Sequence, residues 1–304
     1  MKILVIFTGG TIGSLTNNGI ISTDSGTQYM LIDEYKKNYS TDVIFETLSP
    51  YNELSENNTG LTISMLVSEL KSVLAKDYDG IIITHGTDTL QYSASALWYL
   101  VTPQIPVLLV SSNYVLTDSR ANGHANFKAA VDYIINHGKC GIYISYRNSD
   151  NITRIYEGIS TLNHLPYSDD LYALCDIKDK PLSDLNPPKK WNSDVMRIFP
   201  YVGMKYPLPE EHTKAVLLDT YHSGTICTAS PDSKNFFDEL FARKIPVFLI
   251  GMPEGDSYES TKAYEDRHII VLRKASPIAM YMKLFIVTEN YSDYDTIVKY
   301  MTDV

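Results

Sequence analysis

Two stretches of the chain decide the fold: KILVIFTGGTIG at residues 2–13 and GIIITHGTDTL at residues 80–90. Each begins with a run of apolar, mostly β-branched residues, which is typical of a strand buried on both faces of a parallel sheet. Each run then ends in threonine and glycine, joined in the second stretch by histidine and aspartate. Because parallel α/β sheets bind ligands beyond the carboxyl ends of their strands, these two loops are the first candidates for a functional site.

The sequence around these stretches alternates strand patterns with helix patterns. Strands are predicted at residues 3–7, 80–83, 105–110 and 141–146, and helices at residues 61–74, 89–100 and 122–136. An alternating order of this kind predicts an α/β fold built on a mostly parallel sheet, with helices on both of its faces.

The periodicity disappears between residues 178 and 209, where six prolines occur. A shorter α/β pattern follows, with strands at 215–218, 246–250 and 268–272 and helices at 233–243, 277–287 and 291–301. A single core rarely grows beyond ~250–300 residues, so a chain of 304 residues has room for two domains. We expect a large N-terminal domain at 1–185, a linker at 186–212 and a smaller C-terminal α/β domain at 213–304.

Composition excludes several classes of function. With 44% hydrophobic and 20% charged residues the chain is a globular protein and not a disordered one. A net charge of −10 argues against nucleic acid as a partner, because that binding depends on basic side chains. No apolar run approaches the ~20 residues of a membrane helix, and the N-terminus lacks the pattern of a signal peptide. We therefore expect a cytoplasmic protein that does not bind membranes.

The cysteines are Cys140, Cys175 and Cys227. They are too far apart for the spacing of metal ligands and too few for a disulfide framework. We expect them to be reduced and buried, and we expect neither a metal nor an organic cofactor.

The first loop carries a pair of glycines flanked by Thr8 and Thr11. Paired glycines allow the backbone to approach a ligand closely and expose amide donors, although a plain tight turn explains them equally well. A phosphate-binding loop is excluded, because no Lys-Ser/Thr pair follows.

In the second loop, Asp88 is suited to accept a substrate ammonium group, while the following helix directs amide donors toward negative charge. The alternative is that Asp88 or Thr89 is simply the N-cap of that helix. For His85 we expect a structural, hydrogen-bonded role, since the neighbouring sequence offers no Ser or Cys partner.

The motifs TGGTIG at 8–13 and THGTDT at 84–89 resemble the two signatures of the bacterial-type L-asparaginases. The segments YSASAL at 92–97 and RANGHAN at 120–126 are similar to the cytoplasmic, type I branch, and YHSGT at 221–225 and Ser276-Pro277 resemble weaker landmarks. This resemblance implies a two-domain asparaginase-like fold and hydrolysis of a side-chain amide, such as L-asparagine to L-aspartate and ammonia.

The resemblance also implies roles for individual residues. Thr11 matches the nucleophile, Thr87 matches the group that activates water or stabilises the oxyanion, and Asp88 matches the residue that holds the substrate amino group. Substrate-binding positions fall on Gly10, Ser55, Gly86 and Asp88. The small-molecule amino-acid substrate would be bound in a homodimer or homotetramer, whose neighbouring subunit contributes near residues 254–259.

The chain departs from the family at three positions. Gly158 falls where the family has a lysine, and residues 151–167 contain no lysine, which leaves Lys128 and Lys178 as candidates to reach the site in space. The family has a tyrosine on a mobile N-terminal lid, and its position falls near Ile20 or Ile21 in this sequence, with Tyr29 the nearest tyrosine. Ser55 aligns with the family's substrate-binding serine only with a shift of one residue. Because losing a general base costs ~10²–10⁴ in rate, two alternatives stay open: an amino-acid-binding or regulatory homologue with weakened turnover, and a hydrolase for a different amide.

Overall fold

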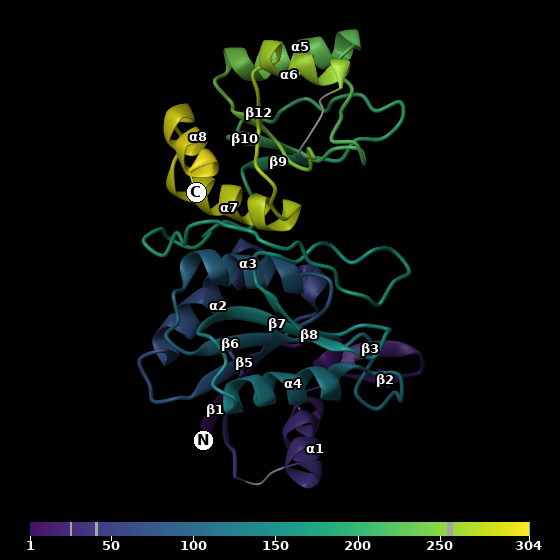
Figure 1. The fold of residues 1–304 in the computed structure, drawn as a ribbon, viewed down its shortest axis with the longest axis vertical. Coiled ribbons are helices and arrows are strands. Elements are labelled where there is room, and N and C mark those ends of the chain that lie inside the picture. Colours follow the sequence, from purple (N-terminus) through teal and green to yellow (C-terminus); the bar gives the residue numbers. More distant parts are fainter. Residues whose placement is uncertain (25, 40–41, 254–257, 304) are drawn as a thin grey trace.

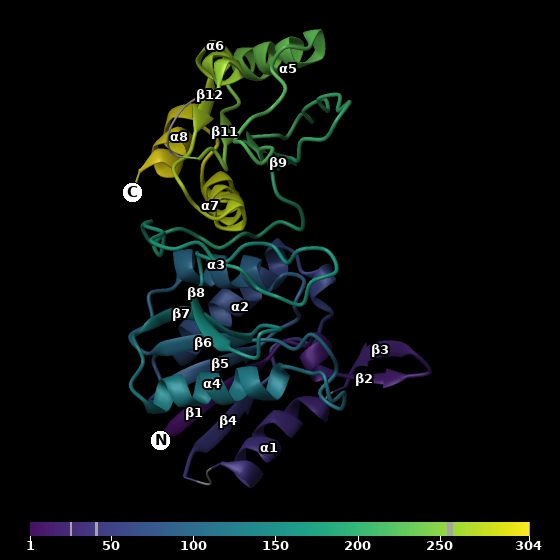
Figure 2. The same ribbon diagram turned by 45° about the vertical axis from the view of Figure 1, so that its right-hand side comes forward.

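A computed structural model describes residues 1–24, 26–39, 42–253 and 258–303. The first domain is built on a six-stranded sheet in the order β4-β1-β5-β6-β7-β8 (Figure 1; β4 is labelled in Figure 2). The strands are β1 (Lys2–Phe7), β4 (Ile44–Leu48), β5 (Gly80–Thr84), β6 (Pro106–Val110), β7 (Gly141–Arg147) and β8 (Thr153–Glu157). All neighbours are parallel except β7 and β8, which are antiparallel.

Helices cover both faces of this sheet (Figure 2). On one face lie α1 (Met30–Asn38) and α4 (Gly123–Ile135), and on the other lie α2 (Gly60–Val73) and α3 (Leu90–Leu100). Successive residues of β1 point to opposite faces, so Val5 packs in the core beneath α1 and α4 while Ile6 packs in the core beneath α2 and α3. Burial on both faces explains why the sequence of β1 is uniformly apolar.

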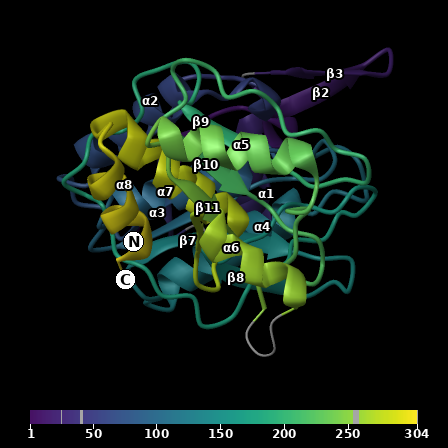
Figure 3. The ribbon, with the colours of Figure 1, turned by 90° about the horizontal axis from the view of Figure 1, so that it is seen from above.

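The second domain contains a four-stranded parallel sheet in the order β12-β11-β10-β9. Its elements are β9 (Val195–Ile198), β10 (Ala215–Leu218), α5 (Pro231–Ala242), β11 (Val247–Leu249), α6 (Ala263–Asp266), β12 (Ile269–Val271), α7 (Pro277–Asn290) and α8 (Tyr294–Thr302). Figure 3, viewed from above, shows α5 and α6 lying over this sheet. The predicted fold class, a large mostly parallel sheet followed by a smaller α/β unit, is confirmed.

Strand β9 lies within the stretch 186–212 that the sequence indicates as a linker, and it pairs with β10 along its full length. Helix α7 lies between the two sheets and packs on α3 of the first domain (Figure 1). The rings of Tyr92 on α3 and Tyr281 on α7 meet edge to face at 6.0 Å, and Arg197 of β9 donates to the Tyr92 hydroxyl at 3.2 Å. The two units therefore share a packed boundary that includes both an aromatic contact and a hydrogen bond from a charged side chain.

A two-stranded hairpin, β2 (Ser14–Asn17) and β3 (Ile20–Thr23), projects from the first domain (Figures 2 and 3). Its two-residue turn has positive φ at Asn18 (52°) and Gly19 (77°), which matches the type I′ turn of tight hairpins. Ile20 on this hairpin is 70% exposed.

The expectation that the cysteines are buried is wrong. Cys140, Cys175 and Cys227 are free thiols and all three are exposed. Each lies in a connecting segment outside the named helices and strands, where the backbone runs over the surface. Within the described residues, no helix combines the length and the apolar character needed to cross a bilayer.

Candidate active site

The two threonine loops leave neighbouring strands of the sheet at the same edge. Strands β1 and β5 pair in parallel with Phe7 opposite Thr84, so the residues that follow each strand emerge side by side. The Thr8 hydroxyl donates to the Thr84 carbonyl at 2.7 Å and ties the two loops together. Adjacency in the sheet therefore brings together two motifs that lie about 75 residues apart in the sequence.

A third loop, residues 52–56, joins them from the other side of β1, because it follows the neighbouring strand β4. Gly10 N–H donates to the Glu53 carbonyl at 2.9 Å, and Glu53 N–H donates to the Thr8 carbonyl at 3.1 Å. Ser55, the first residue of a short 3₁₀ helix (Ser55–Asn57), is only 4% exposed.

Glycines allow the three loops to touch. Gly10 has φ of 79°, and a Cβ placed there would lie 2.3 Å from the Cα of Gly86. A Cβ on Gly86 would lie 2.4 Å from the Ser55 hydroxyl oxygen. No other residue type fits between these backbones without displacing one of them. The structure thus brings Gly10, Ser55 and Gly86 together, while their contact with substrate stays a prediction.

Thr11 follows Gly10 directly, and Thr87 and Asp88 follow Gly86, so all three are next to this junction in the chain, with their side chains at different depths. Thr11 begins a 3₁₀ turn (Thr11–Gly13) and is half-buried, and the preceding Gly10 carbonyl accepts from the Ser14 hydroxyl at 2.8 Å. Thr87 is half-buried and Asp88 is exposed. Within the described residues, no hydrogen-bond or ion-pair partner of the Asp88 carboxylate is found, which leaves it available to a cationic ligand.

His85 is buried and holds the second loop in place. Its Nδ1 lies 2.8 Å from the Gly86 carbonyl, which can only accept, so Nδ1 carries the proton. Nε2 then accepts, with the Ser93 hydroxyl at 2.8 Å and the Asn58 amide at 3.3 Å. Burial lowers the pKa of His85 to about 4, against the opposing effect of the Gly86 hydrogen bond. The structural role is confirmed, but the expectation that no Ser partner exists is wrong, because Ser93 of α3 hydrogen-bonds the ring.

Thr89 occupies the N-cap position of α3 but makes no capping hydrogen bond with its side chain. Its hydroxyl instead donates to the Ser55 carbonyl at 2.9 Å and accepts from the Asn58 amide at 2.9 Å. The alternative in which this loop contains only a helix cap therefore does not account for Thr89, whose side chain fastens the second loop to the third.

A cavity of about 370 Å³ opens beside Thr87 and Asp88. The ends of two further strands contribute Asn113 and Tyr146, and the connection after β8 closes the cavity with His164, Leu165, Pro166, Ser168 and Asp169. None of the described residues that line this cavity is a lysine. The arrangement is a polar pocket that holds hydroxyl groups, carboxylates and one imidazole.

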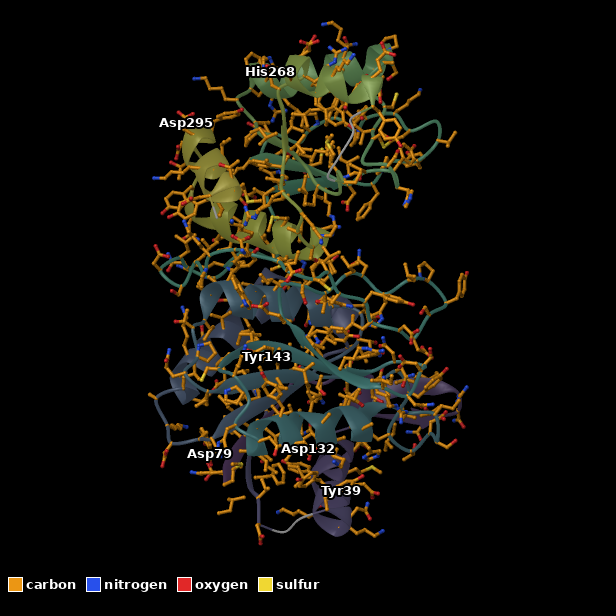
Figure 4. All side chains as sticks on the ribbon, viewed as in Figure 1. Tyr39, Asp79, Asp132, Tyr143, His268 and Asp295 are labelled. Atoms are coloured by element: carbon orange, nitrogen blue, oxygen red, sulfur yellow. The ribbon has the colours of Figure 1, made fainter. Side chains whose placement is uncertain are left out.

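Neither Lys128 nor Lys178, the two candidates for the lysine that the resemblance to the asparaginases implies, lines this cavity. Lys128 pairs with Asp132 at 2.5 Å and lies over the ring of Tyr39, on the side covered by α1 and α4 (Figure 4). Lys178 lines a separate cavity beside β8. Position 158 is itself crowded, since a Cβ on Gly158 would lie 3.0 Å from the Ala94 carbonyl oxygen of α3.

The lid candidates lie on two different segments. Ile20 and Ile21 are exposed on β3, whereas Tyr29 packs edge to face on Phe7 with ring centroids 5.2 Å apart. Of the residues expected to come from a neighbouring subunit, 254–257 lie outside the described part of the chain. No cluster of metal-ligating side chains occurs among the residues that the structure describes.

Sequence reasoning alone does not identify Asn113, Tyr146 and His164 as residues of this pocket. Asn113 and Tyr146 lie at the carboxyl ends of β6 and β7, so the rule that directs attention to the first two loops could have found them. His164 lies in an irregular segment, and no local sequence pattern marks it.

Comparison with known proteins finds relatives both by sequence and by structure. The chain is 29% identical over 192 residues to an L-asparaginase of Thermococcus kodakarensis, covering 60% of this chain and 57% of that protein. It is 32% identical over 145 residues to one of the subunits of glutamyl-tRNA(Gln) amidotransferase of Methanococcus maripaludis, covering 45% of this chain and 32% of that protein. The matches thus span about a third to just over half of these relatives.

Solved structures extend the similarity of fold to the whole chain. The L-asparaginase of Thermococcus kodakarensis superposes with a TM-score of 0.78 at 24% identity, covering 99% of this chain and 97% of that one. L-asparaginase I of Vibrio cholerae superposes with a TM-score of 0.77 at 20% identity, covering 100% and 97%. Residues 2–162, more than half of the sequence and the part that holds all three loops, match the family described as "Asparaginase, N-terminal", and the chain therefore belongs to the asparaginase family.

Proposed function

We propose that the protein hydrolyses a side-chain amide, L-asparagine or a related compound, with Thr11 as the nucleophile. The observation that carries this proposal is the convergence of three loops, in which Gly10, Gly86 and Ser55 approach so closely that no Cβ fits between them. Such packing fixes the backbone next to Thr11 and Thr87, which supports the proposal because amide hydrolysis requires a fixed geometry.

In the proposed reaction the Thr11 oxygen attacks the amide carbon, and the C–N bond breaks as the nitrogen takes a proton and leaves as ammonia. Water then attacks the resulting ester, and Thr11 regains its proton as the carboxylic acid departs. Asp88 binds the substrate ammonium group, for which its unpaired, exposed carboxylate is suited. An aliphatic hydroxyl needs a base to react at neutral pH. A base of this kind can lie in the cavity that Thr87 lines.

The test is ammonia release from asparagine, glutamine and short amides by the wild-type protein and by Thr11→Ala. We expect the variant to lose activity by ~10³-fold or more. Thr302→Ala is the matched control, because Thr302 is exposed at the end of α8 in the second domain. Equal activity of the wild type and Thr11→Ala would refute the assignment of the nucleophile.

A second function is favoured by one observation, the absence of lysine from the described lining of the cavity. In this alternative the protein binds an amino acid, as a regulatory homologue, and has little turnover. Calorimetry would then show binding of aspartate without ammonia release from asparagine, and the binding would be lost in Asp88→Ala.

A hydrolase for a different amide is the third candidate. The relative named as a subunit of glutamyl-tRNA(Gln) amidotransferase matches 45% of this chain, so the substrate panel includes glutamine and γ-glutamyl amides as well as asparagine. Activity on one of these and not on asparagine would support this candidate.

We further propose that the protein is a cytoplasmic homodimer or homotetramer with domains at 1–185 and 213–304, the second of which also includes β9 from the intervening stretch. Light scattering coupled to gel filtration measures the assembly. Limited proteolysis, with cleavage expected within 186–212 outside β9, tests the domain limits.

A further inference from the structure

His164 is the second histidine beside the proposed site, and it has no role in the reaction proposed above. It lies in the irregular connection between β8 and β9 and lines the same cavity as Thr87 and Asp88. This connection is held over the end of β7, because the Tyr146 hydroxyl donates to the Asp169 carbonyl at 2.8 Å. The rings of Tyr146 and His164 lie 5.5 Å apart.

The hydrogen bonds of His164 determine which nitrogen is free. Nδ1 lies 3.0 Å from the Asp170 carbonyl, and because a carbonyl only accepts, Nδ1 carries the proton. Nε2 then holds a lone pair, and it is shielded from solvent without any hydrogen-bond partner among the described residues. A buried acceptor left unpaired is unfavourable by ~1–3 kcal/mol, so this atom lacks a partner that a bound ligand or water molecule would supply.

The charges around the ring come from three segments. Asp88 faces it from the loop after β5, Asp169 and Asp170 from its own segment, and Tyr146 from β7. Burial lowers the pKa of His164 below 6.5, while the hydrogen bond to the Asp170 carbonyl and then the charges of Asp88, Asp169 and Asp170 act in the opposite direction. The imidazole is consequently neutral at pH 7, which is the state a proton acceptor requires.

His85 is the other histidine near the site, but both of its nitrogens are engaged, with the Gly86 carbonyl and with Ser93 and Asn58. His164 therefore differs from His85 in two features that matter for proton transfer: its residue lines the cavity, and its basic nitrogen, although shielded from solvent, has no hydrogen-bond partner among the described residues. None of the described residues that line the cavity is a lysine. At Gly158, the position aligned with the family lysine, a Cβ would lie 3.0 Å from the Ala94 carbonyl oxygen of α3.

We propose that His164 Nε2 is the proton acceptor of this site and takes the place of the missing lysine. This inference rests on the proposed amide hydrolysis. A water molecule in the cavity, which at about 370 Å³ has room for several, gives one proton to Nε2 as its oxygen bonds to the acyl carbon on Thr11. The acyl carbon–Thr11 oxygen bond then breaks, and the same proton passes to the Thr11 oxygen, so His164 returns to its neutral form.

The lack of a protein partner for Nε2 among the described residues agrees with this role. Contacts of an acid–base group are often long without substrate and shorten when the complex forms. Substrate held by Asp88 and Thr11 would complete the cavity that His164 lines and supply the partner that Nε2 lacks.

The experiment measures kcat/KM for the best amide across pH in the wild type, His164→Asn and the control His212→Asn. An asparagine amide can still donate to the Asp170 carbonyl but has no basic nitrogen, and His212 is an exposed residue with 59% of its side chain accessible. We expect a loss of ~10²–10⁴-fold in His164→Asn and no loss in the control. The wild-type rate should fall as pH decreases below 6.5, because the acceptor becomes protonated, and this acid limb should disappear in the variant.

Two further measurements separate proton transfer from a merely structural role. Added imidazole should restore part of the activity of His164→Ala, and more basic imidazoles should restore more. In the wild type, the ¹⁵N signal of His164 Nε2 should shift when L-aspartate is added, a readout that does not depend on the folding of any variant.

The outcomes of these experiments test the role of His164 separately from the proposed amide hydrolysis. Thr11-dependent ammonia release with an unchanged rate and acid limb in His164→Asn would overturn the role of His164 and leave the hydrolase intact. An Nε2 signal unmoved by saturating aspartate would also overturn it. A wild-type protein that releases no ammonia from any amide would overturn both.

Discussion

Replacing Gly10 with alanine tests whether contact between the loops, and not backbone conformation alone, builds the site. Gly10 and Gly19 have nearly the same φ, 79° and 77°, but Gly10 has ψ of −178°, a conformation that glycine alone readily adopts. Alanine is therefore strained by about 1–3 kcal/mol at Gly10 and by about 1–2 kcal/mol in the turn at Gly19. Their surroundings differ. The new Cβ would meet the Gly86 backbone at 2.3 Å in Gly10→Ala, whereas nothing lies within 4 Å of it in Gly19→Ala.

Overpacking against a backbone that cannot move aside costs a further ~1–3 kcal/mol. We therefore expect Gly10→Ala to lower the free energy of unfolding by about 2–6 kcal/mol and Gly19→Ala by about 1–2 kcal/mol. Displacement of the adjacent Thr11 by even ~1 Å should reduce amide hydrolysis by ~10²-fold in Gly10→Ala only.

Urea unfolding and ammonia release on the two purified variants give both quantities. The reasoning is refuted if the two substitutions cost the same stability, because the Gly86 contact would then contribute nothing. Normal turnover in a destabilised Gly10→Ala would separate stability from the site and refute the link to Thr11.

Three further predictions concern buried polar groups. Folding lowers the pKa of His85 from 6.5 to about 4, so as pH falls the unfolded chain takes up a proton before the folded chain does, and stability decreases between pH 6.5 and 4. At about 1.36 kcal/mol per pKa unit, the loss in the free energy of unfolding is about 3 kcal/mol. Urea unfolding should show this loss in the wild type but not in His85→Gln. Asp179 and Lys283 form an ion pair at 2.7 Å with each side chain 1% exposed, so Asp179→Asn should cost about 3–5 kcal/mol, and a loss under about 1 kcal/mol by calorimetry would contradict this. The Ser276 hydroxyl caps α7, accepting from Ala279 N–H at 3.3 Å, and donates to the Thr161 carbonyl at 2.6 Å. Ser276→Ala should therefore cost about 2–4 kcal/mol in thermal unfolding, and a loss under about 1 kcal/mol would contradict this.

Elements with a strong internal pattern are predictable from the sequence. Strands β1, β5 and β6 are buried along nearly their whole length, so their sequences are continuous apolar runs that no other element of that length explains. Strand β4 escapes prediction because it is an edge strand with mostly exposed and half-buried residues. Strand β9 escapes it because it lies inside a proline-rich stretch and is recognisable only through its pairing with β10.

The residues of the candidate site are likewise only partly predictable from the sequence. Thr11, Thr87 and Asp88 follow closely on buried strands, so local sequence and the parallel topology together identify their loops. His164 belongs to no helix or strand, and it reaches the cavity only because Tyr146 and Asn148 hold its segment through the Asp169 and Leu171 backbone. Contacts of that kind have no period and leave no mark in the sequence.

By itself, the sequence determined the α/β class, the two-part organisation and the two threonine loops, because burial on both faces of a parallel sheet and sharp turns at glycine are recorded in consecutive residues. Only the tertiary structure decided that Gly10, Gly86 and Ser55 touch, that the cysteines are exposed, and that a histidine with a free nitrogen lines the cavity from which lysine is absent among the described residues. Those properties depend on which strands are neighbours and on which loops fold over their ends. The energies involved come from contacts between residues distant in the chain, and a local pattern carries no information about them.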